Sequence, residues 1–261
     1  MKLHVEVEPG GRGAHLLLVH GFLSSRAQWR PNLAALKQHV RPVIVELWGH
    51  GRSPVPGDPA ADQVTSYIEA FEAVRRELGV DRWLVCGQSF GAGLTIRYAH
   101  SHPAQVIGQI FTNSVSALSA PGEREGGADR MARADALERG GRAAIEALRF
   151  HPRFSTRFAS EVKREMLEDA ALIQPAAIAN AIRYTAPQLS VVDCLSGLTV
   201  PGLLVNGLWE RPFQPLRARA AKLLPSLAIV DLEGGHSINV EAPAPFNEAV
   251  ARFAAKRIQA A

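Results

Sequence analysis

The sequence has little of what marks disulfide-rich, membrane or nucleic-acid-binding proteins. Its 261 residues include two cysteines, Cys86 and Cys194, so we expect no disulfide framework and a reducing compartment. No apolar stretch approaches the ~20 residues that a membrane-spanning helix needs. The net charge of +4 comes from interspersed charges, which predicts neither a nucleic acid nor a membrane as partner. The charged opening MKLHVEVEPG lacks the apolar core of a signal peptide, so we expect a cytoplasmic protein.

Strand-like and helix-like segments alternate through most of the chain. Continuous apolar runs typical of buried parallel strands occur at HLLLVH, RPVIVEL and RWLVCG, residues 15–20, 41–47 and 82–87. Helical periodicity lies between them, at 28–39 and at 65–79, where Ser66 and Glu69 fit a capping box. The repetition predicts an α/β fold, with a mostly parallel central sheet and helices on both faces.

The alternation stops after Asn113 and resumes near residue 200. Residues 115–187 are rich in Ala, Arg and Glu and contain no convincing strand, which predicts an all-helical insertion. Strand patterns return in VPGLLVNG and LAIVDL, at 200–207 and 227–232, and a last helix is expected at 245–258. We therefore predict one α/β core made of residues 1–114 and 188–261, with a helical cap at 115–187.

The stretch GQSFG, residues 87–91, matches the pattern G-x-S-x-G between a predicted strand and a predicted helix. A serine at such a sharp turn is held in a strained backbone conformation, and glycine is needed on either side because a side chain would collide with the turn. The turn exposes the hydroxyl at the carboxyl edge of the sheet. Ser89 is thus the candidate nucleophile.

A serine hydroxyl needs a base, and the base needs an acid that fixes its tautomer. His236 is the candidate base, because it lies in the glycine-rich loop GGHSINVEAP after the last predicted strand. Glu210 follows the strand that ends near residue 206 and is the candidate acid. The carboxylates Asp193, Asp231 and Glu233 remain alternatives for that role.

Attack by serine creates an oxyanion, which requires preorganised N–H donors. The backbone N–H of Phe90, directly after the nucleophile, is one candidate. The N–H of Phe22 in the loop LVHGFLSS is the other, since Gly21 allows that backbone to approach closely. We expect His20 in the same loop to be a structural hydrogen-bonding residue.

Together these segments resemble the α/β-hydrolase fold superfamily. HGFLSSRAQW is similar to its oxyanion loop, GHGRS to its turn after the next strand, GQSFGAG to its nucleophile elbow and GGHSINVEAP to its histidine loop. Two departures stand out. Glu210 occupies the acid position where the family usually has aspartate, and Glu46 and Trp48 replace the Asp and Pro of many relatives, which predicts an altered pocket wall.

The resemblance implies hydrolysis of an acyl compound through an acyl-enzyme, with no cofactor and no metal. A serine at position 89 argues against the aspartate-dependent haloalkane dehalogenases and epoxide hydrolases. We expect a carboxylesterase acting on a small ester, in a pocket lined by Phe22, Phe90, Phe111 and Trp209. A carbon–carbon hydrolase or lactonase is the alternative, and its carboxylate-bearing substrate would need a cap arginine. A ligand-binding receptor with residual turnover is a third possibility. The candidate cap arginines are Arg149, Arg153, Arg157 and Arg183.

Overall fold

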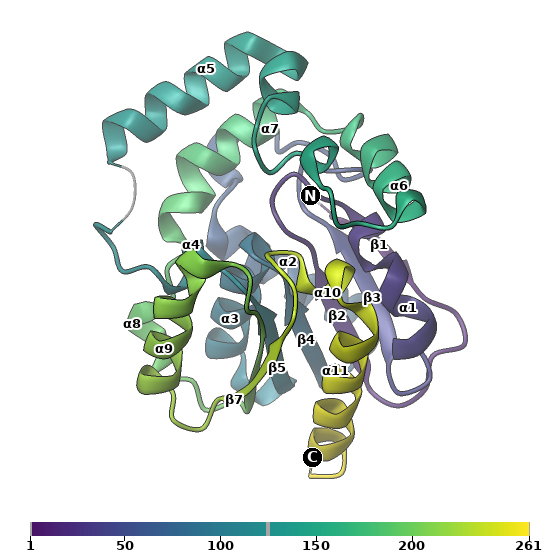
Figure 1. Cartoon of the computed structure of the whole chain (residues 1–261). Coiled ribbons are helices and arrows are strands. Elements are labelled where there is room, and N and C mark those ends of the chain that lie inside the picture. The colour runs from purple at the N-terminus through teal and green to yellow at the C-terminus, as the bar shows by residue number, and fades with distance from the viewer. Residues whose placement is uncertain (1, 124–125, 261) are drawn as a thin grey trace.

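The computed structural model describes residues 2–123 and 126–260. Its centre is a seven-stranded sheet in the order β1-β3-β2-β4-β5-β6-β7 (Figure 1). β1 runs antiparallel to β3 and every other neighbouring pair is parallel, which confirms the mostly parallel sheet. The strands are β1 His4–Val7, β2 His15–Val19, β3 Arg41–Glu46, β4 Trp83–Gly87, β5 Val106–Thr112, β6 Gly202–Gly207 and β7 Ala228–Leu232.

Successive strand residues point into two separate apolar cores, one on each face of the sheet. On β2, Leu17 and Val19 belong to one core, whereas Leu16 and Leu18 belong to the other. Both faces are covered, so the strands are apolar throughout instead of alternating with polar residues. This explains why the sequence shows continuous apolar runs.

Helices cover both faces. One core is closed by α2 (Val64–Glu77), α3 (Phe90–Ser101) and α9 (Gln214–Leu223), and the other by α1 (Arg30–Leu36) and α11 (Pro243–Ile258). No helix among the described residues is long and apolar enough to cross a membrane. The placement of helices on both faces of the sheet confirms the predicted α/β fold.

The predicted capping box at the start of α2 is wrong. The helix begins at Val64, one residue before the expected segment, and Ser66 therefore lies inside it. Gln63 is the N-cap residue and makes no side-chain capping hydrogen bond. Burial of Tyr67, Phe71 and Val74 against the sheet stabilises the helix instead.

Between β5 and β6 the described residues form helices and turns without a strand. The elements are α4 Val115–Leu118, α5 Gly127–Glu146, α6 Ser160–Ala170, α7 Pro175–Asn180 and α8 Val192–Leu195. α5, α6 and α7 lie together above the sheet (Figure 1) and share a small apolar core that also takes in Leu23. The division into a 115–187 cap and a core remains a prediction, and residues 124–125 lie outside the described part.

Both cysteines are buried and form no disulfide. Cys86 on β4 belongs to the core under α1 and α11, and Cys194 lies on α8. Burial raises the pKa of both thiols above the ordinary value.

Candidate active site

Ser89 lies at the sharp turn between β4 and α3. It is one of two described residues other than glycine with a positive φ, 51°, a conformation that L side chains rarely adopt. A Cβ atom at Gly87 would overlap the carbonyl oxygen of Gly91, and a Cβ at Gly91 would overlap that of Val19 on the neighbouring strand β2. The two glycines are therefore required by the close backbone contacts of the turn.

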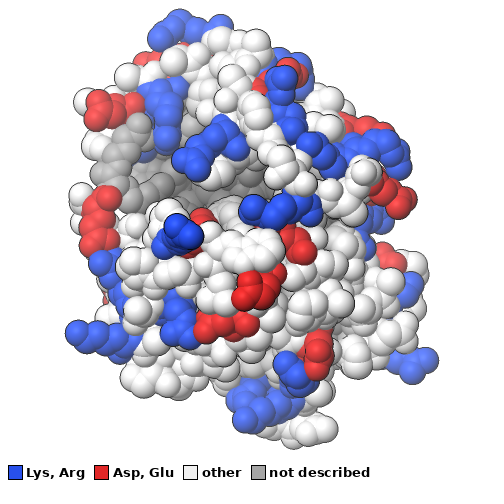
Figure 2. Space-filling model, in the orientation of Figure 1, with Lys and Arg blue, Asp and Glu red and all other residues white. Residues whose placement is uncertain are grey.

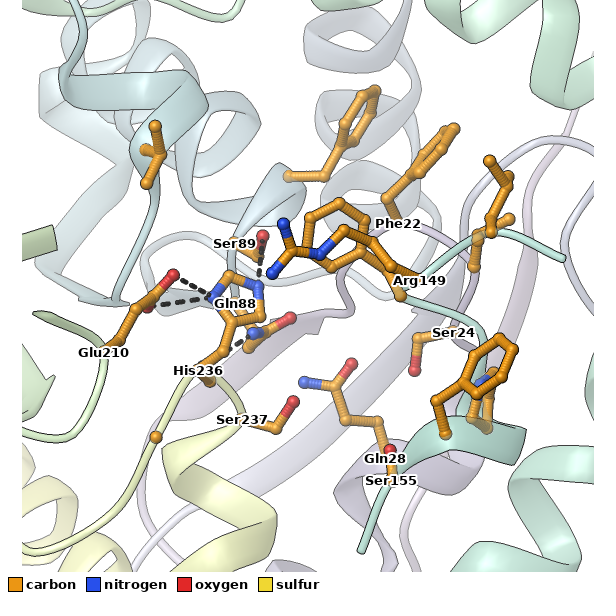
Figure 3. Close-up of a pocket in the computed structure, with 18 of the residues that line it drawn as sticks. Phe22, Ser24, Gln28, Gln88, Ser89, Arg149, Ser155, Glu210, His236 and Ser237 are labelled. Carbon is orange, nitrogen blue, oxygen red and sulfur yellow. Dashed lines mark hydrogen bonds and ion pairs between the residues drawn. The ribbon is translucent and has the colours of Figure 1, made fainter. Parts of the chain in front are cut away.

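Three side chains from distant parts of the sequence form a continuous hydrogen-bonded chain (Figure 3). His236 Nε2 lies 2.9 Å from Ser89 Oγ, and its Nδ1 lies 2.9 and 3.0 Å from the two carboxylate oxygens of Glu210. Glu210 follows β6, and His236 lies in the loop between β7 and α10 (Ile238–Glu241). The arrangement gives His236 an acceptor at Nδ1 and leaves Nε2 directed at the serine hydroxyl.

Glu210 is held as a carboxylate by its surroundings. Its burial alone would raise the carboxyl pKa, but the hydrogen bonds with His236 and Asn113 and the nearby positive charge of Arg149 together lower the pKa below the ordinary value. An ionised acid favours the tautomer of His236 that carries its proton on Nδ1.

The three competing carboxylates are engaged elsewhere. Asp193 accepts a hydrogen bond of 2.9 Å from Arg97, and Asp231 accepts one of 2.7 Å from Arg217. Glu233 accepts a hydrogen bond from a tryptophan indole. Of the candidate acids in the sequence, the structure therefore brings only Glu210 to the imidazole of His236.

Asn113 was not among the predicted site residues, yet it fixes the end of the strand that precedes the acid. Asn113, directly after β5, accepts a hydrogen bond of 2.8 Å from the N–H of Gly207 and donates one of 2.9 Å to its carbonyl oxygen. Its side chain thus pairs with the end of β6, three residues before Glu210. Its only signal in the sequence is its place at the end of a predicted strand.

The two predicted oxyanion donors lie beside the serine. Phe90 is the first residue of α3, so its N–H has no acceptor within the helix. Phe22 lines the same cavity as Ser89, and its ring stacks on that of Phe90 with the centroids 5.4 Å apart. A Cβ at Gly21 would contact the Ser89 side chain, which shows how closely this loop approaches the turn.

Two buried histidines hold the loop that carries Phe22. His20 Nδ1 donates to the carbonyl oxygen of Gly21 at 2.7 Å, and its Nε2 accepts the N–H of Leu47 at 3.0 Å. His50 Nε2 accepts the N–H of Leu23 at 3.3 Å. Burial lowers the pKa of His20 to about 3 and that of His50 to about 4, so both stay neutral. His20 is thus a structural residue, as expected, whereas His50 was not anticipated.

A cavity of about 880 Å³ opens above Ser89 and is also lined by residues of α5, of α6 and of the segment between them. Phe22, Phe90 and Trp209 line it, as expected. Phe111 does not: it is fully buried in the core under α2 and α3. Its position near a strand end was correctly predicted, but its side chain points into a core instead of upward.

Positive side chains lie around the opening of this cavity (Figure 2). Of the four candidate cap arginines, Arg149 and Arg157 line the cavity, and Arg133 lines it as well. Arg153 and Arg183 do not line it. Arg183 is bound to Asp135 of α5 at 2.6 Å. Arg149 extends toward the side of the cavity that holds Ser89 and His236 (Figure 3), and no hydrogen bond or ion pair joins it to the described residues.

The expectation that Glu46 and Trp48 alter the pocket wall is wrong. Neither lines the cavity. The buried carboxylate of Glu46 accepts the N–H of Arg52 at 2.7 Å and holds the GHGRS turn, and Trp48 packs on the ring of Tyr67 with the centroids 4.3 Å apart. Both residues therefore stabilise the core behind the site.

Comparison with known proteins places the chain in one family. Residues 16–249 match the Alpha/beta hydrolase family. The chain is 25% identical over 248 residues to a putative 2-succinyl-6-hydroxy-2,4-cyclohexadiene-1-carboxylate synthase of Bacillus subtilis, covering 91% of this chain and 89% of the relative. Its fold is similar to that of MenH from S. aureus (TM-score 0.81, 19% identity, 97% and 98% of the two chains covered) and of a putative aryl esterase from Burkholderia cenocepacia (TM-score 0.75, 20% identity, 98% and 95% covered).

Proposed function

Because the chain belongs to the alpha/beta hydrolase family, we propose that it is a serine hydrolase that cleaves small carboxylic esters through an acyl-enzyme intermediate. The observation that carries the proposal is the unbroken hydrogen-bonded chain from Ser89 through His236 to Glu210 at the floor of the cavity. This arrangement supplies a nucleophile, a base and an acid that orients the base.

In the first step, Ser89 Oγ attacks the ester carbonyl carbon and His236 Nε2 takes the hydroxyl proton. The carbonyl oxygen becomes an oxyanion, which the N–H groups of Phe22 and Phe90 stabilise. Collapse of this intermediate breaks the bond to the alcohol, which leaves with the proton from His236. Glu210 stabilises the transient imidazolium charge.

In the second step, water replaces the alcohol. His236 Nε2 takes a proton from the water as its oxygen attacks the acyl carbon, and the same donors hold the second oxyanion. The bond to Ser89 Oγ then breaks, the serine regains its proton, and the carboxylic acid leaves. The site thus returns to its starting state without any further group.

Turnover of p-nitrophenyl esters of increasing acyl length tests the proposal. We expect the short esters to be hydrolysed and Ser89→Ala to reduce turnover to near background with unchanged thermal unfolding. An organophosphonate should label Ser89 alone, located by mass spectrometry, since an activated hydroxyl beside an oxyanion hole reacts fastest. A binding receptor with this fold would show neither steady turnover nor labelling. Absence of ester turnover, or absence of the label on Ser89, would refute the proposal.

Arg149 favours a second candidate, a carbon–carbon hydrolase or lactonase acting on a carboxylate-bearing substrate. Its guanidinium lines the cavity and forms no ion pair with the described residues, so it is available for an anionic group. The similarity to a relative named for a carboxylate compound points the same way.

A vinylogous diketone acid and a lactone distinguish the candidates when they are added to the ester series. If the substrate carries a carboxylate, Arg149→Gln should raise its KM by roughly 10- to 100-fold, because a charged hydrogen bond is lost. Arg153→Gln, which changes a cap arginine outside the cavity, serves as the control and should leave KM within about threefold. Turnover of the diketone acid alone would refute the esterase proposal.

A further inference from the structure

The backbone on both sides of His236 is tied to one carboxylate, that of Glu241. This residue ends α10, five positions after the histidine, and its side chain is 5% exposed. One carboxylate oxygen accepts the N–H of Gly235 at 2.9 Å, and the other accepts the N–H of Ser237 at 3.2 Å. The two hydrogen bonds fix the Gly234–Gly235 peptide group and the peptide group that directly follows the histidine.

The same carboxylate is paired with the cap. Arg157, in the segment between α5 and α6, forms an ion pair with Glu241 through its Nε. A Cβ at Gly235 would overlap the guanidinium of Arg157 and lie 3.0 Å from both Glu241 oxygens. Glycine at 235 therefore allows the arginine, the carboxylate and the loop backbone to meet at one point.

Arg157 also reaches the loop that carries the acid. Its guanidinium lies over the ring of Trp209, 5.5 Å from the centroid. Trp209 directly precedes Glu210, and its N–H donates to the carbonyl oxygen of Gly234 at 2.8 Å. The loops bearing the acid and the base are thus joined to each other, and one cap side chain contacts both.

From these contacts we infer that Glu241 is a positioning residue for His236, and that Arg157 is a latch through which the seated cap holds Glu241 in place. The inference rests on the proposed function and extends it. With the cap seated, the guanidinium neutralises the buried carboxylate and the carboxylate holds the histidine loop. When the cap lifts, the ion pair breaks and the loop is held by Glu241 alone. Substrate closure and placement of the base are therefore coupled.

Two variants and their combination test this inference. Glu241→Gln cannot accept both N–H groups, so we expect kcat to fall by about 10- to 100-fold with KM changed less than threefold, because His236 is displaced and the cavity is not. Arg157→Gln should lower kcat by about 3- to 10-fold. Because Arg157 acts through Glu241, the double variant should be no slower than Glu241→Gln, whereas independent roles would multiply. Arg157→Lys, which keeps the charge, should recover part of the loss.

Amide hydrogen exchange of residues 234–241 gives a readout independent of any substrate. Exchange of the Gly235 and Ser237 amides should accelerate at least tenfold in Glu241→Gln and to a smaller extent in Arg157→Gln. Arg164→Gln is the matched control, since that cap arginine pairs with Glu168 on the surface of α6 and should change nothing. Unchanged exchange in Glu241→Gln, or multiplying effects on kcat, would overturn the latch. Absence of ester turnover with accelerated exchange would refute the ester chemistry only.

Discussion

Glu210 carries one methylene more than the aspartate usual at the acid position of this family. The structure accommodates the extra length, since both carboxylate oxygens lie about 3 Å from His236 Nδ1. We expect Glu210→Gln to lower turnover by roughly 10³- to 10⁴-fold, because the amide stabilises the wrong tautomer of the histidine. The thermal unfolding temperature should change little. Steady-state kinetics measure the loss of turnover, and a melting curve checks that the fold is intact.

Asp231→Asn is the natural control for this variant. Asp231 is paired with Arg217 and lies away from the imidazole. Turnover by the Asp231→Asn variant should therefore stay within about tenfold of the parent. Loss of activity in Asp231→Asn alone would show that the acid had been assigned to the wrong strand.

Single catalytic candidates were easier to predict than the side chains around them. Ser89, His236 and Glu210 each lie in or next to a glycine-marked turn after a predicted strand, and such turns are encoded by a few adjacent residues. Whether Phe111 points into the cavity or a core depends on how a whole strand is rotated. Whether Arg149 or Arg183 faces inward depends on cap packing, which no local pattern specifies.

The buried carboxyl of Asp62 joins the start of α2 to Thr185. Asp62, two residues before the helix begins, accepts a hydrogen bond of 2.8 Å from Thr185, whose hydroxyl also lies 2.7 Å from the Asp62 carbonyl oxygen. Thr185 ends a π-helical turn, Ala181–Thr185, that follows α7. Tyr67 of α2 is a further hydrogen-bonding neighbour of this carboxyl. Burial raises the pKa of this carboxyl to about 6.

A raised carboxyl pKa makes the protein less stable as the carboxyl ionises. The folded state binds the proton more tightly than the unfolded state, whose pKa is about 3.9, so stability is lost as pH rises from about 4 through 6. Asp62→Asn cannot ionise and should be more stable than the parent by roughly 2 kcal/mol at pH 8, with the gain vanishing near pH 4. Urea unfolding at both pH values measures the difference in free energy of unfolding between the variant and the parent.

Asp129→Asn, an exposed aspartate in the first turn of α5, is the control and should give no pH-dependent gain. An equal gain for both variants would mean that net charge, and not burial of Asp62, explains the effect.

The order of strands and helices was predictable from the sequence, because buried parallel strands and amphipathic helices have distinct periodicities. The ends of helices were less predictable than their order. Ser66 and Glu69 have the spacing of a capping box, yet burial of Val64 extends α2 past them. A capping hydrogen bond contributes about 1 kcal/mol, and burial of one valine contributes as much or more.

A buried cluster of polar and charged groups joins α6 to loops beside the sheet. Asp169 of α6 accepts a hydrogen bond of 2.8 Å from the hydroxyl of Ser25 and one of 3.0 Å from Arg52, both of which belong to loops of the core. Its side chain is only 8% exposed. Asp169→Asn should lower the free energy of unfolding by roughly 1–3 kcal/mol, since the guanidinium of Arg52 loses one of its two carboxylate partners, the other being Glu46.

Glu168→Gln on the same helix affects an exposed pair and should cost less than about 0.5 kcal/mol. Denaturant titration followed by tryptophan fluorescence compares the two. We expect one cooperative transition for the parent, because Leu23 belongs to the small apolar core of α5, α6 and α7, whereas Ala181 and Ala186 of the predicted cap belong to the main core. A separate early transition in the parent would show that the cap unfolds on its own.

The burial of Cys86 and Cys194 makes the native chain suited to time-resolved fluorescence. Their exposed fractions are 0% and 7%, and their raised pKa values leave little reactive thiolate at neutral pH. Cysteines introduced at the exposed positions Arg164 on α6 and Arg252 on α11 would then be the fast-reacting thiols. A donor and an acceptor dye attached there would report any movement of α6 relative to α11 as a change in energy transfer, without removal of either native cysteine.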